Sequence, residues 1–285
     1  MMELSDIVGP YYETYSQETK TYLSKKDSGI YSIFNSIIRK IALLEMNGFP
    51  VETLKIDYHS QQIYDLLFEK KECELNFSDV SDEEKIFFKE KMITSGWGLS
   101  DDVKLLNFKI TNKIINKFFN PSKLVLECYD NLIKSNNIDL NNTIFVWARS
   151  TDKGGETKLP SVESYLKVID SINSSNKEIL LQTDDYRVLS NFKGSNLNLK
   201  TIKEIPISET LKGFHMEMCE ISNDTFKSKY KINKDEYLLQ MYCLSLIAKN
   251  SYKSILYPGN PTTYVPMIKG SFDNCYLFKD DNQLF

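Results

Sequence analysis

Residues 143–156 read Thr143-Ile-Phe-Val-Trp-Ala-Arg149-Ser-Thr-Asp152-Lys153-Gly-Gly-Glu156. The apolar part has the length of a strand, and it ends abruptly in a charged loop that contains a Gly-Gly pair. This pattern predicts a buried strand whose carboxyl end carries the charges, where ligands bind in open α/β sheets. Arg149 can fork onto a phosphate, whereas Asp152 and Glu156 can accept from hydroxyls or remove a proton. A salt-bridged surface loop is the alternative interpretation.

From residue 124 onward the sequence alternates between predicted helices and strands. Strands are expected at residues 143–148, 178–182, 201–205 and 254–257, and helices are expected from Ser161 and over 234–249, the latter opened by an Asn233–Glu236 capping box. This alternation is typical of a parallel, doubly wound sheet.

Three of the predicted loops fall at one edge of that sheet. They are Arg149–Glu156, Asp184-Asp185, and Gly259–Thr263. The last loop can offer N–H groups and hydroxyls at a helix N-terminus, which favours a phosphate. The sequence therefore predicts a nucleotide site here, although Asp184-Asp185 alone also fits a turn with a helix cap.

The first half of the chain also begins as an α/β domain. A loop at Gly29 and Tyr31 precedes an apolar stripe at helical spacing, and residues 51–58 have the composition of a strand. We predict that Gly29 and Tyr31 lie at the mouth of this sheet. The alternative interpretation is that Gly29 only relieves a tight turn. Further helices are expected at residues 62–69, 82–91 and 111–119. We predict two domains, 1–123 and 124–285.

Composition narrows the class of protein. The formal charge is 35 minus 39, or −4, without a long basic run, so neither nucleic acid nor an anionic membrane is an expected partner. No apolar run is long enough to span a bilayer and no leader is evident, which favours a soluble, cytoplasmic protein. The five cysteines are scattered and only two histidines occur, so we expect free thiols and no metal.

The second half resembles the nucleotide-sugar-binding half of the α-1,6-fucosyltransferase and NodZ-like family. That family has a strand that ends in H-x-R-R-T-D-K, then a Glu, then a Pro and a Tyr on the next helix, and later T-D-D. The corresponding residues here are Trp147-Ala-Arg149-Ser150-Thr151-Asp152-Lys153, Glu156, Pro160 with Tyr165, and Thr183-Asp184-Asp185. The resemblance covers roughly residues 120 to 275.

The resemblance implies a GT-B fold, in which two Rossmann-like domains face each other across a cleft. It also implies an inverting glycosyltransferase that needs neither a metal nor another cofactor and transfers a sugar to a hydroxyl of a glycan or glycoprotein. The donor would lie in the second domain and the acceptor in the first. GDP-fucose is the first expected donor. UDP-xylose or another UDP-sugar is the alternative, because Gln240 stands where the family has a guanine-reading acid and Ser150 replaces a second Arg.

The same resemblance implies roles for individual residues. Arg149 would hold the donor diphosphate, Asp152 and Lys153 would shape the reacting site, and Glu156 would be the base or orient the sugar. The remaining donor contacts would come from Tyr165, Asp184, Asp185, Gln240, Gly259, Asn260 and Thr262.

Two other functions compete with this one. A non-catalytic module that binds a nucleotide-sugar or a glycan could retain the same fold. Hydride transfer on a Rossmann domain is disfavoured, because no G-x-G-x-x-G follows a predicted strand.

Overall fold

The computed structural model describes residues 3–8, 13–25, 30–56, 59–94, 107–149, 159–173, 176–208 and 220–278. The chain divides into two compact units. Unit 1 comprises residues 1–124 and 266–272, and unit 2 comprises 125–265 and 273–285. The boundary expected from the sequence lay between residues 123 and 124, and the return of residues 266–272 to unit 1 was not foreseen.

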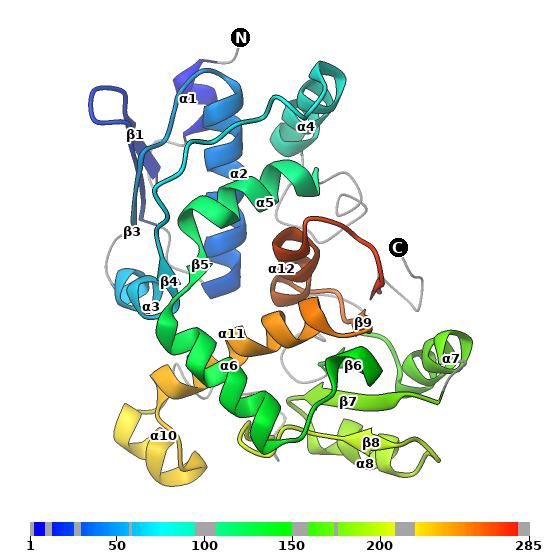
Figure 1. The fold of residues 1–285 in the computed structure, drawn as a ribbon. Coiled ribbons are helices and arrows are strands. Elements are labelled where there is room, and N and C mark those ends of the chain that lie inside the picture. Colours follow the sequence, from blue (N-terminus) through cyan, green and yellow to red (C-terminus); the bar gives the residue numbers. More distant parts are fainter. Residues whose placement is uncertain are drawn as a thin grey trace. The chain divides into compact units, whose positions relative to one another are not determined.

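Unit 2 is built on a five-stranded sheet in which every neighbouring pair is parallel. Four of its strands, β6 to β9, are labelled in Figure 1. The strands are β6 (Thr143–Ala148), β7 (Glu178–Thr183), β8 (Leu199–Lys200), β9 (Lys253–Leu256) and β10 (Cys275–Leu277). All six residues of β6 are buried, as expected for a continuous apolar strand that is covered on both faces. This sheet confirms the α/β class and is compatible with a Rossmann-like fold.

The strand order is β10-β9-β6-β7-β8. From β6 the chain moves outward through β7 to β8, then crosses back and continues through β9 to β10 on the other side. The direction therefore reverses between β6 and β9, which are themselves paired from Ile144↔Lys253 to Trp147↔Leu256. This is the order of a doubly wound sheet, in which ligands bind outside the carboxyl ends of the strands at the point of reversal.

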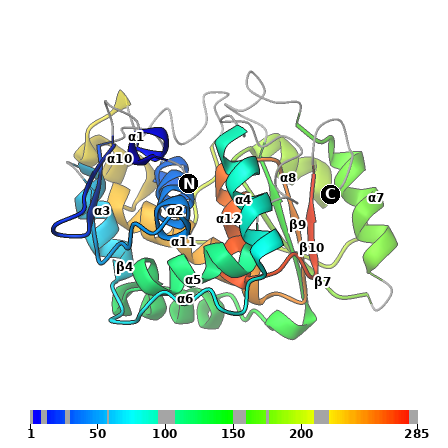
Figure 2. The same cartoon turned by 90° about the horizontal axis from the view of Figure 1, so that it is seen from above.

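Helices cover both faces of this sheet, and Figure 2 shows α7 and α11 on opposite sides. The helices of unit 2 are α6 (Lys123–Ser135), α7 (Val162–Ile172), α8 (Tyr186–Lys193), α10 (Asn223–Tyr230), α11 (Lys234–Asn250) and the first part of α12 (Asn260–Lys269), with a 3-10 turn η2 (Leu140–Asn142). The predicted capping box of α11 is confirmed, since Asn233 and Glu236 exchange side-chain-to-backbone hydrogen bonds of 2.8 Å.

One predicted strand is wrong. Residues 201–205 form a loop, and the short strand β8 precedes them. Ile202 and Ile205 are the two apolar residues of this segment, and both are buried. The backbone N–H of Ile205 turns back to the carbonyl of Ile202 at 3.4 Å, so these side chains anchor a turn instead of lining a sheet.

Unit 1 has a smaller, mixed sheet. Strand β1 (Glu13–Ser16) pairs antiparallel with β2 (Thr21–Ser24), and β2 pairs parallel with β3 (Thr53–Ile56). A second sheet consists of the two-residue strands β4 (Phe68–Glu69) and β5 (Asn120–Pro121). The helices are α1 (Leu4–Ile7), α2 (Ile30–Met46), α3 (His59–Leu67), α4 (Asp82–Thr94) and α5 (Phe108–Phe118). The predicted helices at 62–69, 82–91 and 111–119 correspond to α3, α4 and α5.

The returning segment 266–272 is held in unit 1 by contacts with α5. The Asn112 amide donates to the carbonyls of Met267 and Ile268 at 3.2 and 3.0 Å, and Phe108 stacks on Phe272 with ring centroids 5.9 Å apart. Helix α12 thus begins in unit 2 and ends in unit 1, and Pro266 is the first residue of the returning segment.

Candidate functional site

The candidate site lies at the carboxyl edge of the unit 2 sheet. Arg149 directly follows β6, Asp184 directly follows β7, and Tyr257 to Gly259 connect β9 to α12. Because all these strands are parallel, their carboxyl ends meet at one edge. The loops after β6 and β9 flank the point where the strand order reverses.

An ion pair joins two of the predicted site residues across this edge. The last register pair of β6 and β7 is Ala148↔Thr183, so the next residue of each strand emerges side by side. Arg149 Nε donates to Asp184 Oδ2 at 3.1 Å, and the two side chains are only 17% and 14% exposed. A partly buried guanidinium beside a strand end is suited to an anion, because water screens its charge weakly.

Asp185 serves the local backbone. It is the N-cap of α8, where its Oδ1 accepts from the backbone N–H of Arg187 at 2.8 Å. The carboxylate also pairs with the Arg187 guanidinium, and this hydrogen bond raises the pKa of Arg187 above its ordinary value. The helix-cap interpretation considered for this acidic turn therefore describes the role that Asp185 has in the fold.

Tyr165 on α7 places a buried phenol beside the ion pair. Its ring packs against Phe192 and Phe278, with centroid distances of 6.2 and 4.8 Å, and its side chain is 2% exposed. Burial raises the pKa of the phenol well above its ordinary value, and the nearby Tyr257 and Asp184 raise it further. Its hydroxyl has no hydrogen-bond partner among the residues that the structure describes. A buried donor in this state costs about 1–3 kcal/mol, which a polar ligand atom would offset.

The turn after β9 is tightly closed. A Cβ at Gly259 would lie 2.2 Å from the Tyr257 ring, so only glycine fits this approach. The Thr262 hydroxyl donates to the carbonyls of Tyr257 and Gly259 at 2.6 and 2.8 Å, which fixes the turn from inside. Thr262 is fully buried, and Asn260 begins α12. Pro261 has no N–H and the Thr263 N–H donates to the Gly259 carbonyl at 3.0 Å, so the N–H groups of Asn260 and Thr262 are those that the start of α12 can offer to an anion.

Gln240 lies on α11 in unit 2 and is partly buried. Its Oε1 atom is buried and has no hydrogen-bond partner within the described part of the chain. In unit 1, the predicted loop position of Tyr31 is wrong, because this residue lies in the first turn of α2. It is buried and packs edge-on against Phe34, with ring centroids 6.3 Å apart. The other predicted site residues, Gly29, Asp152, Lys153 and Glu156, lie outside the described residues.

Two residues at this edge were not singled out from the sequence. Tyr257 is buried, packs against Trp147 with centroids 6.2 Å apart, and influences the Tyr165 phenol. Tyr186 opens α8 directly after Asp184-Asp185 and is 53% exposed. The position of Tyr186 directly after an acidic turn could have identified it as a site residue. Tyr257 has no such feature, because in the sequence it only ends an apolar strand.

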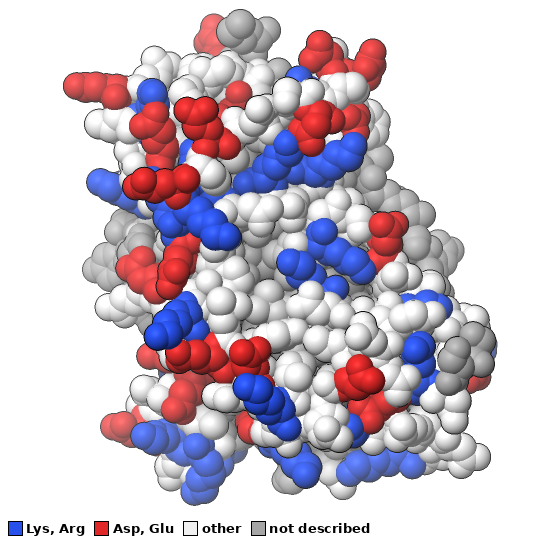
Figure 3. All heavy atoms as spheres, in the orientation of Figure 1, with Lys and Arg blue, Asp and Glu red and all other residues white. Residues whose placement is uncertain are grey.

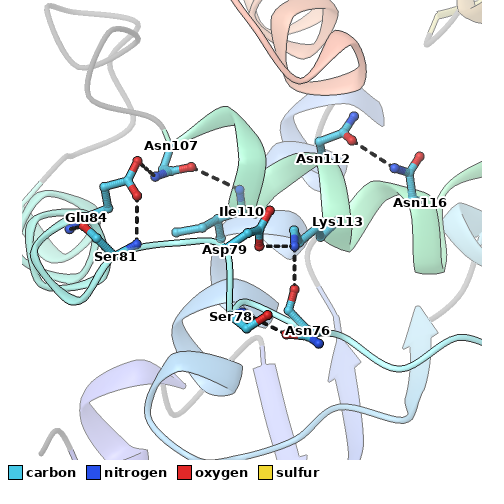
Figure 4. Close-up of polar contacts among 10 residues, drawn as sticks. All are labelled: Asn76, Ser78, Asp79, Ser81, Glu84, Asn107, Ile110, Asn112, Lys113 and Asn116. Atoms are coloured by element: carbon cyan, nitrogen blue, oxygen red, sulfur yellow. Dashed lines mark hydrogen bonds and ion pairs between the residues drawn. The ribbon is translucent and has the colours of Figure 1, made fainter.

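A polar cluster in unit 1, drawn in Figure 4, has a structural explanation instead. Lys113 donates to the Asn76 carbonyl at 2.6 Å and pairs with Asp79, which ties α5 to the chain before α4. Asn107 caps α5 by accepting from Ile110 N–H at 3.2 Å and donates to Glu84 at 3.3 Å. These contacts cap α5 or join it to residues 76–84, so each polar group has a partner within the cluster and the cluster does not require a ligand.

Surface charge does not single out a further site. In Figure 3, blue and red side chains are interspersed on the face shown, in keeping with the net charge of −4. Among the described residues, there is no group of three or more His, Cys, Asp or Glu side chains that could hold a metal ion. Within the same residues, none of the helices has the length and hydropathy to cross a bilayer.

No protein-family model matches the sequence, and no curated protein matches it either.

Proposed function

We propose that this chain is a glycosyltransferase that binds a nucleotide-sugar at the carboxyl edge of the unit 2 sheet. The observation that carries the proposal is the Arg149–Asp184 ion pair at the carboxyl ends of β6 and β7, next to the strand reversal between β6 and β9. The buried Tyr165 hydroxyl, which has no described partner, lies close enough to Asp184 to be affected by its charge. A nucleotide-sugar offers groups that complement this edge, a charged diphosphate for the guanidinium and several hydroxyls for the phenol and the carboxylate.

Each group has a chemical task in this proposal. Arg149 binds the diphosphate and stabilises the charge that develops on it as the sugar leaves. The Tyr165 phenol stays protonated and donates to a ribose or sugar oxygen, while the Asp184 carboxylate accepts from a hydroxyl. The backbone N–H groups of Asn260 and Thr262 at the start of α12 contribute further donors to the phosphates.

The transfer step follows the inverting route of the family that the sequence resembles. The acceptor hydroxyl attacks the anomeric carbon from the face opposite the diphosphate, as Asp152 or Glu156 removes its proton and Lys153 helps to neutralise the leaving group. The acceptor is a glycan or glycoprotein bound through the first half of a GT-B arrangement. GDP-fucose is the first donor to test and UDP-sugars are the second. Gln240, whose carbonyl oxygen lacks a described partner, is the proposed contact to the base.

Turnover tests this proposal. The purified protein is incubated with GDP-fucose, UDP-xylose and other nucleotide-sugars in the presence of EDTA, with and without a glycan mixture, and released nucleoside diphosphate is quantified by chromatography. We expect release with one donor, loss of release in Glu156→Gln with donor binding retained, and loss of binding in Arg149→Ala.

The matched control is Lys200→Ala, which removes an ion pair with Glu178 from the same sheet but away from its carboxyl edge. Donor binding without any turnover would favour the alternative function, a non-catalytic module that binds a nucleotide-sugar. The absence of binding by any nucleotide or nucleotide-sugar would refute the site itself.

A further inference from the structure

Two cysteines of unit 2 lie together although they are far apart in the sequence. Cys128 is half-buried on α6, and Cys243 is fully buried on α11. The Cys243 thiol donates to the backbone carbonyl of Val125 at a sulfur-to-oxygen distance of 3.5 Å. Helical side chains lean toward the preceding turn, so the Cys128 side chain lies over the carbonyl of Val125, three residues earlier. The Cys243 sulfur therefore contacts the turn of α6 from which the Cys128 side chain projects.

The two thiols differ in acidity for a physical reason. Hydrogen bonding between the two thiols lowers the pKa of the Cys128 thiol, although burial and the charge of Glu204 oppose this effect. The same interaction, together with burial, raises the pKa of the Cys243 thiol. Cys128 is thus both the more accessible and the more readily ionised of the two, as expected for the thiol that reacts first with an oxidant.

We propose that Cys128 and Cys243 are a site of reversible oxidation that closes to a disulfide when the protein meets a peroxide. The Cys128 thiolate attacks one peroxide oxygen and breaks the O–O bond, which yields a sulfenic acid and, after proton uptake, one water. The Cys243 sulfur then attacks the Cys128 sulfur and displaces the hydroxyl group, which leaves with the thiol proton as a second water. The two sulfurs together lose two electrons to one peroxide molecule.

The cross-link would join α6 to α11 within unit 2. Because it closes a long loop of chain, it restricts the unfolded state and stabilises the folded unit. Gln240 stands three residues before Cys243 on α11, so the linkage also fixes the helix that carries this residue. The proposal does not depend on the function of the carboxyl edge, since it rests on the two thiols alone.

Peptide mapping tests the site in the full chain. The protein is treated with increasing hydrogen peroxide, its remaining thiols are blocked with N-ethylmaleimide, and tryptic peptides are analysed by mass spectrometry. We expect peptide 124–134 to appear linked to peptide 235–249, with a mass about 2 Da below the sum of the two reduced peptides. Dithiothreitol should restore both peptides, and the oxidised protein should melt at a higher temperature than the reduced protein.

Variants separate this site from general thiol oxidation. Cys73→Ser removes an exposed thiol of unit 1 and should leave the linked peptide unchanged. Cys128→Ser and, independently, Cys128→Ala should abolish both the linked peptide and the gain in Tm, and neither change alters a fully buried position. Over-oxidation of Cys128 to sulfinic acid without a linked peptide, or its linkage to another cysteine, would overturn the proposal.

Discussion

The two edges of the unit 2 sheet differ in how their polar groups are hydrogen-bonded. At the amino edge, polar groups are satisfied by nearby turns. The Thr143 hydroxyl donates to the Asp139 carbonyl at 2.7 Å, and Asn173 and Lys177 exchange hydrogen bonds, the shorter of 2.7 Å. At the carboxyl edge, side chains from separate elements converge in a buried setting, and the Tyr165 hydroxyl has no described partner.

This difference teaches where to look for a ligand in a doubly wound sheet. A polar side chain that hydrogen-bonds to the backbone of its own turn has a structural role, as Asp185 has at the N-cap of α8. The buried Tyr165 hydroxyl, which has no partner among the described residues, has no comparable structural role. Burying a polar group without a hydrogen bond is destabilising, so a ligand that accepts from this hydroxyl would remove that cost.

The largest expected effect is on ligand affinity. Arg149→Ala should weaken nucleotide-sugar binding by about 10- to 100-fold, because a hydrogen bond to a charged group contributes about 1.5–3 kcal/mol. Lys200→Ala should leave the affinity unchanged, since its ion pair with Glu178 involves the first residue of β7. Titration calorimetry measures both. Equal affinities for wild type and Arg149→Ala would remove the distinction between the edges.

Tyr165→Phe is expected to have smaller effects, namely a gain in the stability of the ligand-free protein and a loss of ligand affinity. This change removes only the buried hydroxyl and keeps the ring packing with Phe192 and Phe278. The ligand-free protein should gain about 1 kcal/mol of stability, a rise in Tm of about 2–4 °C, because an unpartnered donor is lost. Ligand affinity should fall by about 3- to 10-fold. A fall in stability on thermal denaturation would mean that the hydroxyl has a structural partner.

The third expectation concerns acid stability and involves Glu204, after β8. Burial raises the pKa of Glu204, but hydrogen bonds from Ser135 and Asn136, of 2.6 and 2.7 Å, outweigh it and lower the pKa below the ordinary 4.5. This contribution to stability is present above the ordinary pKa and is lost as the pH falls through the lowered one.

Glu204→Gln should therefore melt at a lower temperature than wild type at pH 7, and the difference should shrink as the pH falls below about 4. Thermal melts at a series of pH values measure this. A constant difference at every pH would show that the ionised carboxylate contributes nothing.

The smallest effect is expected for the stability of Lys200→Ala. Its ion pair with Glu178 has a nitrogen-to-oxygen distance of 2.8 Å, and the lysine side chain is 33% exposed. Pairs of this kind contribute less than about 1 kcal/mol and are weakened by salt. Chemical denaturation at low and high salt should show a small difference from wild type that decreases with salt. A larger loss that salt does not change would point to packing by the lysine stem.

The parts of the fold that could be predicted carry local, strong signals. Strand β6 is a continuous apolar run, and α11 begins with a capping box and continues into an unbroken buried run from Tyr242 to Ala248. The hairpin of β1 and β2 was missed because its strands have four residues each and are specified by pairing with distant β3. The Pro-Gly-Asn-Pro stretch at residues 258–261 gave a turn signal, but α12 already begins inside it, at Asn260.

The candidate site likewise has features that local sequence predicts and features that it does not. Residue type and position after a strand were enough to single out Arg149 and Asp184, because parallel strands bring their carboxyl ends to one edge. No local pattern reveals that the Tyr165 hydroxyl lacks a partner or that Tyr257 lies near it. Those properties depend on how α7 packs on the sheet.

Hydrogen–deuterium exchange with and without nucleotide-sugar tests the central claim most directly, since it locates the ligand on the unmodified protein. We expect slower exchange in peptides that cover residues 144–149, 181–187 and 255–263 when GDP-fucose or the alternative UDP-sugar is present, and no change in peptides that cover 136–143 and 176–179. Protection confined to the amino-edge peptides, or no protection by any nucleotide-sugar, would contradict the assignment of the carboxyl edge as the donor site.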